Sequence, residues 1–464
     1  MIWNQLRHPP WLHLLITAAV VLVVYVPDIG RGFVKDDFGW IVASQCRTLG
    51  NVERLFVSTS GFYRPLVSLS FAANEYVGGT NPVGYGATNL ALAVLTALSV
   101  AWVVRSWRFS AAACIFAAAL WILNPHGINM AVLWISGRTA LLLTLFSVLA
   151  AVAASRDRPF LSALFAFLGM LSKEEAVLLP LALLVLLALH DAGRRRLVTG
   201  GVYFAAAWIA YFVLRAHSNA MTPATAPLVY RFTFAPSEVA RNVAEYADRA
   251  CTFTLASLVL LAVISRTLPR LDGSERRLAA TGVFWLISGF ALTVFLPVRS
   301  SLYACFPSVG AVWAGAAIAS SIWRSMRPDR RRSVAIAAVL LPVMLIPVYR
   351  VRNVRWTELA DLTSRVMPTL ASAAQASPDG DILLVDERST RVNIAAAFDG
   401  LLVDAITLAC GTGKRTVWLV PPEPGAPPTD TVPRRFTSSW RLEAGRLVRE
   451  DGSKWVGVPA AVYR

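Results

Sequence analysis

Cysteine is scarce in this sequence, and the cysteines that are present show no paired spacing. They stand far apart, at Cys46, Cys114, Cys251, Cys305 and Cys410. Disulfide frameworks and zinc sites both need cysteines at characteristic spacings. We therefore expect neither a disulfide-stabilised fold nor a cysteine-based zinc site.

Three further patterns are missing. The first apolar segment lacks a small-x-small cleavage site, so we interpret it as a membrane span and not as a signal peptide. No internal repeat is visible, which excludes a repeat array. The segment 411–416 resembles a nucleotide-binding loop, but Leu408 replaces the first glycine of that motif and Arg415 replaces its serine or threonine. We expect no ATP site there.

Charged residues are also few. They make up 16% of the chain, whereas 56% is hydrophobic, and the mean hydropathy is +0.55. Soluble domains fall well below that value, so the composition indicates a polytopic membrane protein. The net charge of +16 is unevenly placed, because residues 352–464 carry 14 basic and 13 acidic residues. We attribute the basic excess of residues 1–351 to membrane topology and anionic lipid, and not to nucleic acid.

Apolar runs long enough for membrane helices fill most of residues 1–351. We expect eleven spans, with 159–171 and 175–190 alternatively forming one buried hairpin: 11–27, 85–104, 109–124, 139–154, 159–171, 175–190, 197–214, 250–265, 278–296, 302–323 and 333–349. With the N-terminus in the cytoplasm, the inner loops carry 17 basic and 5 acidic residues and the outer loops 13 and 10. The positive-inside rule favours this orientation. We expect a cell (inner) membrane protein with an extracytoplasmic C-terminus.

A second domain is expected at 352–464. Residues 381–386 and 416–420 are typical of buried strands, and 392–408 of a helix. Two short strands near 440–448 and 454–462 are expected to form a hairpin. The fold class is therefore an α-helical polytopic membrane core, 1–351, followed by a small extracytoplasmic α/β domain.

The predicted topology gathers a polar set on the outer face. Ionisable groups beside the hydrocarbon region are costly and usually mark a working site. Among them, Asp36 and Asp37 directly follow the first span, and two adjacent carboxylates divide the work of taking a proton and orienting a partner. The alternative is a cap for the helix that begins at Phe38, which needs only one acid. The set comes from five loops: Asp36, Asp37, Arg64, His126, Arg138, Lys173, Glu174, Glu175 and Arg299.

Four cationic residues of this set are candidates for binding a phosphate. Arg64 precedes Pro65, a typical first residue of a helix. Arg138 and Arg299 lie at expected helix starts, where the helix dipole adds positive potential. Lys173 lies between two apolar segments. The alternatives are snorkelling or anchoring at the membrane interface.

Other polar residues of the outer loops are weaker candidates. Tyr303 follows Arg299 by about one helical turn. His126 alternatively is an interfacial residue satisfied by backbone. Ser172 and Glu175 have the spacing of a capping box, a structural alternative that does not explain Lys173.

The motifs together resemble a known family. Phe33-Val34-x-Asp36-Asp37, Tyr63-Arg64-Pro65-Leu66, Asn81-to-Tyr85 with Asn89, Asn124-Pro125-His126 with Trp134-to-Arg138, Leu171-to-Glu175 and Arg299-x-x-x-Tyr303 occur in this order. The order is similar to the GT-C superfamily of integral membrane glycosyltransferases, and looks closest to the O-mannosyltransferases that carry TPR repeats. Those repeats are absent here, and Asn129 stands where relatives often have a carboxylate.

The resemblance implies a function. Such enzymes transfer a sugar from a polyprenyl-phosphate donor on the outer leaflet, and their first acidic residue after the first span is the catalytic base, which corresponds to Asp36. Some relatives use a divalent cation, for which Asp36, Asp37 and Glu174 are candidate ligands. The acceptor stays open between a protein hydroxyl, a glycan and a lipid. A transporter or flippase of a lipid-linked or polar solute is the alternative, although the matching repeats of transporters are not visible.

Overall fold

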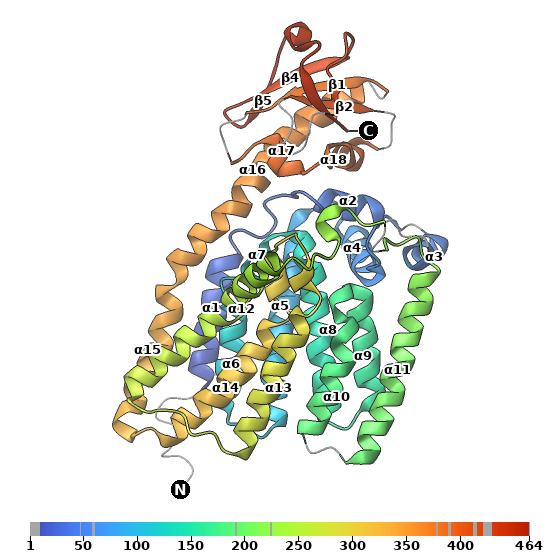
Figure 1. Ribbon diagram of the computed structural model, residues 1–464. Helices are drawn as coiled ribbons and strands as arrows, with labels where there is room; N and C mark the ends of the chain where they lie inside the picture. The colour runs from blue at the N-terminus through green and yellow to red at the C-terminus, as the bar shows by residue number, and fades with distance from the viewer. Residues whose placement is uncertain are drawn as a thin grey trace.

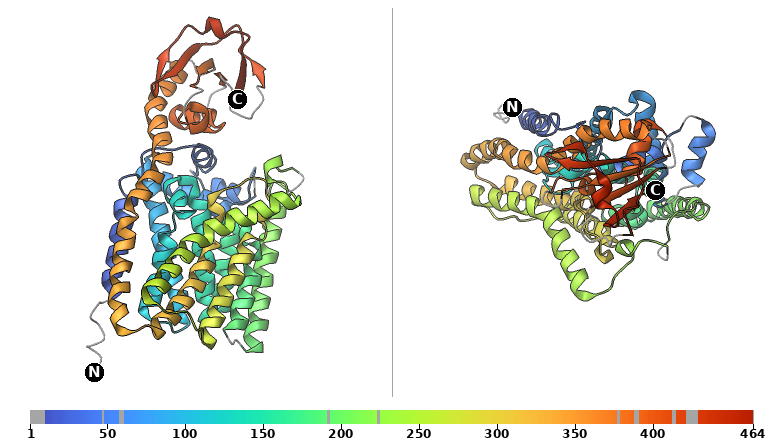
Figure 2. Two further views of the ribbon diagram at one scale, coloured as in Figure 1. Left: turned by 60° about the vertical axis from the view of Figure 1, so that its left-hand side comes forward. Right: turned by 90° about the horizontal axis from the view of Figure 1, so that it is seen from above.

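The computed structural model describes residues 10–463 apart from 47, 58–60, 191–192, 223–224, 377–378, 388–390, 412–414 and 421–428. A helical bundle carries a small sheet domain at one end, and α16 (Ile346–Ala376) connects the two (Figures 1 and 2). We call this end of the bundle the domain-facing end. The predicted nucleotide-loop lookalike lies partly outside the described residues, at 412–414.

All eleven segments that were expected to span the membrane contain a helix. Their helices are α1 (Pro10–Tyr25), α5 (Pro82–Ser106), α6 (Ala111–Ile122), α8 (Arg138–Ser155), α9 (Pro159–Ser172), α10 (Leu179–Leu189), α11 (Arg194–Ala216), α12 (Pro236–Ser265), α13 (Gly273–Phe290), α14 (Ser308–Ser325) and α15 (Pro328–Met344). Seven helical stretches of the described chain are long and apolar enough to cross a bilayer, and three shorter apolar helices accompany them. The chain is a multi-pass membrane protein.

Short helices cover the domain-facing end. They are α2 (Asp37–Ala43), α3 (Leu49–Val57), α4 (Pro65–Gly78), α7 (Ile128–Leu133), η2 (Ile135–Gly137), η3 (Glu174–Leu178), η4 (Leu228–Tyr230), η5 (Thr293–Phe295) and η6 (Ser301–Ala304). Pro65 occupies the first turn of α4, as expected. The predicted capping box at Ser172 is wrong, because Ser172 ends α9 and its hydroxyl donates to the carbonyl of Leu168 at 2.8 Å.

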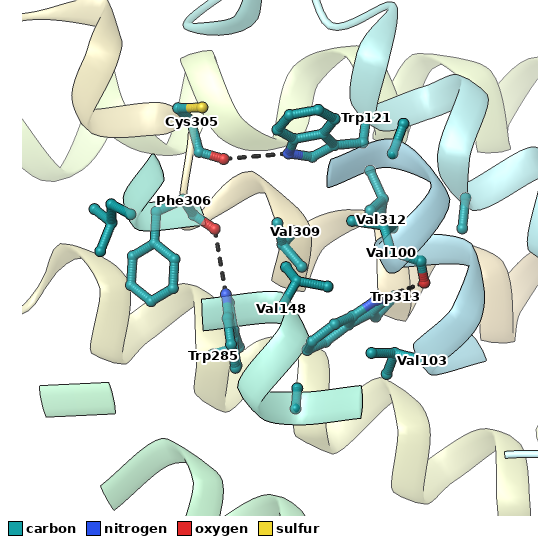
Figure 3. Close-up of a cluster of buried hydrophobic side chains, with 14 of the residues drawn as sticks. Val100, Val103, Trp121, Val148, Trp285, Cys305, Phe306, Val309, Val312 and Trp313 are labelled. Carbon is teal, nitrogen blue, oxygen red and sulfur yellow. Dashed lines mark hydrogen bonds between the residues drawn. The ribbon is translucent and has the colours of Figure 1, made fainter. Parts of the chain in front are cut away.

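Two buried tryptophans fix the backbone where η6 passes into α14 (Figure 3). The indole N–H of Trp121 donates to the carbonyl of Cys305, and that of Trp285 to the carbonyl of Phe306, each at 3.2 Å. A carbonyl at a break in helical bonding needs such a donor where water is excluded. The contacts hold η6, which carries Tyr303, against the bundle.

The C-terminal sheet has six strands in the order β3-β6-β2-β1-β4-β5. The strands are β1 (Asp381–Val385), β2 (Thr416–Val420), β3 (Asp430–Thr431), β4 (Ser438–Glu443), β5 (Arg446–Arg449) and β6 (Pro459–Tyr463), with η7 (Gly452–Trp455) before the last. β1 pairs in parallel with β2 and β4, whereas β6 is antiparallel to β2. The expected hairpin of 440–448 with 454–462 is wrong, because β4 forms its hairpin with β5.

The helical part of this domain lies between the sheet and the bundle (Figure 1). The single helix expected at 392–408 is two helices, α17 (Ile394–Phe398) and α18 (Leu402–Cys410). Asp399 and Gly400 between them adopt positive φ angles of 48° and 84°, which ends α17. α16 runs through position 352, so the expected domain boundary falls inside one continuous helix.

Candidate active site

The two adjacent aspartates at the start of α2 have separate environments. Asp37 is fully buried, and its carboxylate accepts the backbone N–H of Val34 at 2.9 Å and that of Ser136 at 2.7 Å. The Ser136 hydroxyl also donates to it. Burial raises the pKa of Asp37 to about 7, although these hydrogen bonds act in the opposite direction. Asp37 therefore ties the loop to η2, and both of its oxygens are occupied.

Asp36, in contrast, is exposed. It precedes α2 but makes no side-chain capping bond, so the alternative reading as a cap is not supported. No other described residue forms a hydrogen bond with its carboxylate. Desolvation by the surrounding protein and the charge of Asp399 raise its pKa, while Lys35 and Arg64 lower it. An unpaired carboxylate with a raised pKa is available to accept a proton.

Arg64 precedes α4. Together with Asp36, Lys173, Glu174 and Glu175 it forms what we call the charged group. Its Nε and Nη2 donate to the two carboxylate oxygens of Glu174, at 3.0 and 2.6 Å. Burial alone raises the pKa of Glu174, but the charge and hydrogen bonds of Arg64 outweigh it and lower the pKa to about 2. The guanidinium also lies over the ring of Phe62, 4.0 Å from its centre. Its Nη1 makes no hydrogen bond with the described residues, so one prong stays available to an anion.

Lys173 forms a second, more deeply buried pair beside the first. Its ammonium group lies 2.7 Å from Glu175, and both side chains are at most 5% exposed. The same ammonium lies 4.6 Å from the ring centre of Tyr303 in η6. Because η3 also carries Glu174, the two ion pairs share one short helix. The structure brings together Arg64, Lys173, Glu174, Glu175 and Tyr303, all of which the sequence placed on the outer face; their role in a site stays a prediction.

Arg138 does not belong to this group, which corrects its expected role in binding phosphate. It is fully buried, and its guanidinium donates to the Asn89 side chain and to the carbonyls of Ser70 and Tyr85, at 2.9 to 3.1 Å. Asn89, also a candidate, in turn donates to three carbonyls of the α7–η2 segment. The two side chains hold backbone together and present no free donor to a ligand.

Arg299 and His126 also lie outside the group. Arg299 is ion-paired with Glu238 of α12 and donates to the side chain of Asn242 at 2.7 Å. His126 is half-buried, and burial together with the Arg352 charge lowers its pKa. Neither residue contacts Asp36, Arg64 or Lys173 through a described interaction. Their expected role in the site stays a prediction.

The suggested metal ligands do not fit a divalent ion. Asp37 is saturated by hydrogen bonds, and Glu174 is held by Arg64. Across the described residues, histidine, cysteine, aspartate and glutamate form no cluster of three suited to a metal.

Two neighbours of Asp36 were missed by sequence reasoning. Tyr230 of η4 packs edge-on against Phe62 at 5.0 Å between ring centres and interacts electrostatically with Asp36 and Arg64. Asp399 belongs to the C-terminal domain and lies 3.5 Å from Lys35, which precedes it by 364 positions. Both come from segments far along the chain, and no local pattern marks them.

An apolar groove of about 580 Å³ runs along one face of α11. Its lining includes Trp208, Ile209 and Phe212. The indole N–H of Trp208 donates to the carbonyl of Val177 at 2.7 Å, so the groove adjoins η3.

No protein-family model matches the chain. Over 120 residues it is 31% identical to the Drosophila melanogaster protein O-mannosyl-transferase Tmtc1, a match that covers 23% of this chain and 14% of that relative's length. The ArnT structure from Cupriavidus metallidurans bound to undecaprenyl phosphate aligns with a TM-score of 0.46 and 16% identity over 79% of this chain and 72% of its own. An Archaeoglobus fulgidus oligosaccharyltransferase tethered to an acceptor peptide aligns with a TM-score of 0.46 and 11% identity over 80% and 58%. The sequence match to an O-mannosyl-transferase agrees with the resemblance that the motifs indicate.

Proposed function

We propose that this protein is a membrane glycosyltransferase that transfers a sugar from a polyprenyl-phosphate donor to an acceptor hydroxyl. One observation carries the proposal: an exposed, unpaired carboxylate, Asp36, lies within electrostatic range of Arg64, which keeps one prong free. Transfer from a lipid phosphate needs both parts, a base for the acceptor and a cation for the leaving group.

In the proposed reaction, the Asp36 carboxylate takes the proton of the acceptor hydroxyl. The acceptor oxygen attacks the anomeric carbon, and the bond between that carbon and the phosphate oxygen breaks. The electron pair leaves with the polyprenyl phosphate, and Arg64 binds its growing negative charge. Attack from the face opposite the phosphate inverts the anomeric centre. Asp36 then releases the proton to solvent.

Lys173 is buried, so it acts on the phosphate indirectly, through the position of Arg64 and through its positive charge. Its charge is only locally balanced by Glu175, and it packs against Tyr303. A buried ion pair that shares η3 with Glu174 fixes that helix and therefore the Arg64–Glu174 pair. We assign to Lys173 and Tyr303 the role of holding Arg64 in position and adding positive potential.

A donor of this kind also needs an apolar surface for its chain. The groove on α11 supplies one next to η3, and its tryptophan is fixed by Val177. We assign the groove to the part of the polyprenyl chain nearest the phosphate.

The test uses purified full-length protein and a panel of radiolabelled polyprenyl-phosphate sugars. We expect one donor to be consumed, and the Asp36→Asn variant to consume it much more slowly with unchanged donor affinity. Consumption of no donor, or full activity of Asp36→Asn, would contradict the proposal. Movement of an intact donor across a vesicle membrane without cleavage would support the transporter alternative.

A further inference from the structure

We propose that Asp399 of the C-terminal domain is a positioning residue of the Asp36 site, acting on Asp36 by charge and by its ion pair with Lys35. The domain would then complete the site and not merely cover it. The inference rests on the proposed function, because it assigns Asp399 to the same proton transfer.

The contact that brings Asp399 to the site is well defined. The backbone N–H of Lys35 donates to the carbonyl of Ala397 at 2.8 Å. Three residues after Lys35 and one after Ala397, the rings of Phe38 and Phe398 stack with centres 5.3 Å apart. The segment that carries Asp36 is therefore fixed on both of its sides to the C-terminal end of α17, directly before the turn that carries Asp399.

The domain is held in this place from a second direction. The hydroxyl of Thr363 in α16 donates to the carbonyl of Phe33 at 2.8 Å, and that of Ser364 to the carbonyl of Arg31 at 2.7 Å. α16 thus binds the loop just before Asp36, and the end of α17 contacts the residues on either side of Asp36. A residue on the turn that follows α17 keeps a constant place relative to Asp36.

Both residues of the ion pair have left-handed backbone, as do four other described residues that are not glycine. Lys35 has a φ angle of 53° and Asp399 one of 48°. Left-handed backbone is uncommon for residues other than glycine, and least so for aspartate and asparagine. Strained backbone of this kind concentrates at functional sites. Here both facing residues adopt it, directly beside Asp36.

The charges around Asp36 determine how strong a base its carboxylate is. The charged and titratable neighbours are Lys35, Asp37, Arg64, Tyr230 and Asp399. The negative charge of Asp399 opposes ionisation of Asp36 directly. Asp399 also forms an ion pair with Lys35 at 3.5 Å, so the lysine charge acts on two carboxylates, Asp399 and Asp36. Removing the Asp399 charge therefore makes Asp36 a weaker base, whereas removing the Lys35 charge makes it a stronger one.

The experiment measures kcat/KM against pH for wild type, Asp399→Asn and Lys35→Gln. The acidic limb reports ionisation of Asp36 in the free enzyme. We expect it to move to lower pH in Asp399→Asn and to higher pH in Lys35→Gln, each by about half a pH unit for a screened charge at this range. Glu443→Gln, the same loss of charge at an exposed position of β4, is the control and keeps the wild-type profile.

Opposite shifts distinguish an effect on Asp36 from a general loss of structure. Unmoved limbs in both active variants overturn the role of Asp399 and leave the proposed glycosyl transfer intact. Inactive wild type, or a fully active Asp36→Asn, overturns the proposed function itself. Asparagine suits left-handed backbone, and Asp399→Gly repeats the charge removal if the asparagine variant is unstable.

Discussion

At the residue scale, two neighbouring aspartates at the start of α2 have different surroundings. Asp37 enters the protein, where three donors occupy its oxygens. Asp36 stays exposed beside Arg64 and Asp399. The same contrast separates the arginines, since Arg64 keeps a prong free and Arg138 uses its donors on backbone and Asn89.

Matched asparagine variants distinguish the expected roles of the two aspartates. Asp36→Asn should lower kcat by about two to four orders of magnitude, because it removes a general base, and leave the thermal midpoint unchanged. Asp37→Asn should lower the stability by about 1 to 3 kcal/mol, because an amide cannot accept from all three donors. Unfolding in detergent and turnover per folded molecule measure the two effects. A stable but inactive Asp37→Asn variant would reverse the assignment.

The arginines give a second matched pair. Arg64→Ala should raise the Kd for the donor about 10- to 100-fold, because a charge-assisted hydrogen bond is lost. Arg64→Lys should restore this only in part, since lysine lacks the planar fork. Arg138→Ala should instead lower the thermal midpoint, and Arg299→Ala should leave donor affinity unchanged. Donor titration of the folded variants checks the three affinity predictions, and thermal unfolding checks Arg138→Ala. Weakened donor binding in Arg299→Ala would support a role for that residue in the site.

At the scale of elements, close contact between helices positions the segment that carries Tyr303. α13 and α14 meet at Gly282 and Gly310, where a Cβ on Gly310 would lie 2.2 Å from the carbonyl oxygen of Gly282. Small residues at such crossings allow backbones to approach in a membrane. The tryptophan contacts to Cys305 and Phe306 then fix the start of α14.

Gly310→Val should separate these two helices. Overpacking of a fitted contact costs about 1 to 3 kcal/mol and sometimes more, so we expect a lower thermal midpoint and weaker donor binding through the displaced η6. Gly201→Ala in α11 is the control, because nothing lies within 4 Å of the added methyl group. It should be neutral or slightly stabilising. A Gly310→Val protein as stable as wild type would show that the crossing tolerates a side chain.

At the scale of the whole molecule, the helices that begin beside Asp36 and Arg64, α2 and α4, lie at the end of the bundle that carries the sheet domain (Figure 1). The loops at the opposite end carry the basic clusters, including Arg194–Arg196 and Arg330–Arg332. The positive-inside rule therefore predicts that the domain-facing end is extracytoplasmic.

Cysteine labelling with a membrane-impermeant reagent tests this orientation. In a background without the native cysteines, Glu443→Cys in the sheet domain should react from outside intact cells. Arg195→Cys at the opposite end should react only after the membrane is opened. Reaction of Arg195→Cys from outside would overturn the orientation and with it the outer-face placement of the site.

The local part of this architecture could be predicted from the sequence. Apolar runs located the eleven helices, and short β-rich runs located β1 and β2, because burial of a helix or a strand depends mainly on its own residues. The pairing of β6 with β2 was missed, since register between distant strands is decided by the assembled sheet. The break between α17 and α18 was missed although Asp399-Gly400 is a local turn signal, and the positive φ angles of these two residues end α17.

The sequence by itself determined that this is a multi-pass helical membrane protein with a small C-terminal sheet domain, and that polar residues gather at one end of the bundle. Composition and hydropathy suffice for this, since an apolar solvent accepts few kinds of backbone. Only the tertiary structure decided which polar residues face one another. It buried Arg138 and Asp37, diverted Arg299 to α12, and brought Asp399 to Asp36, because hydrogen-bond partners and desolvation depend on segments that are distant in the chain.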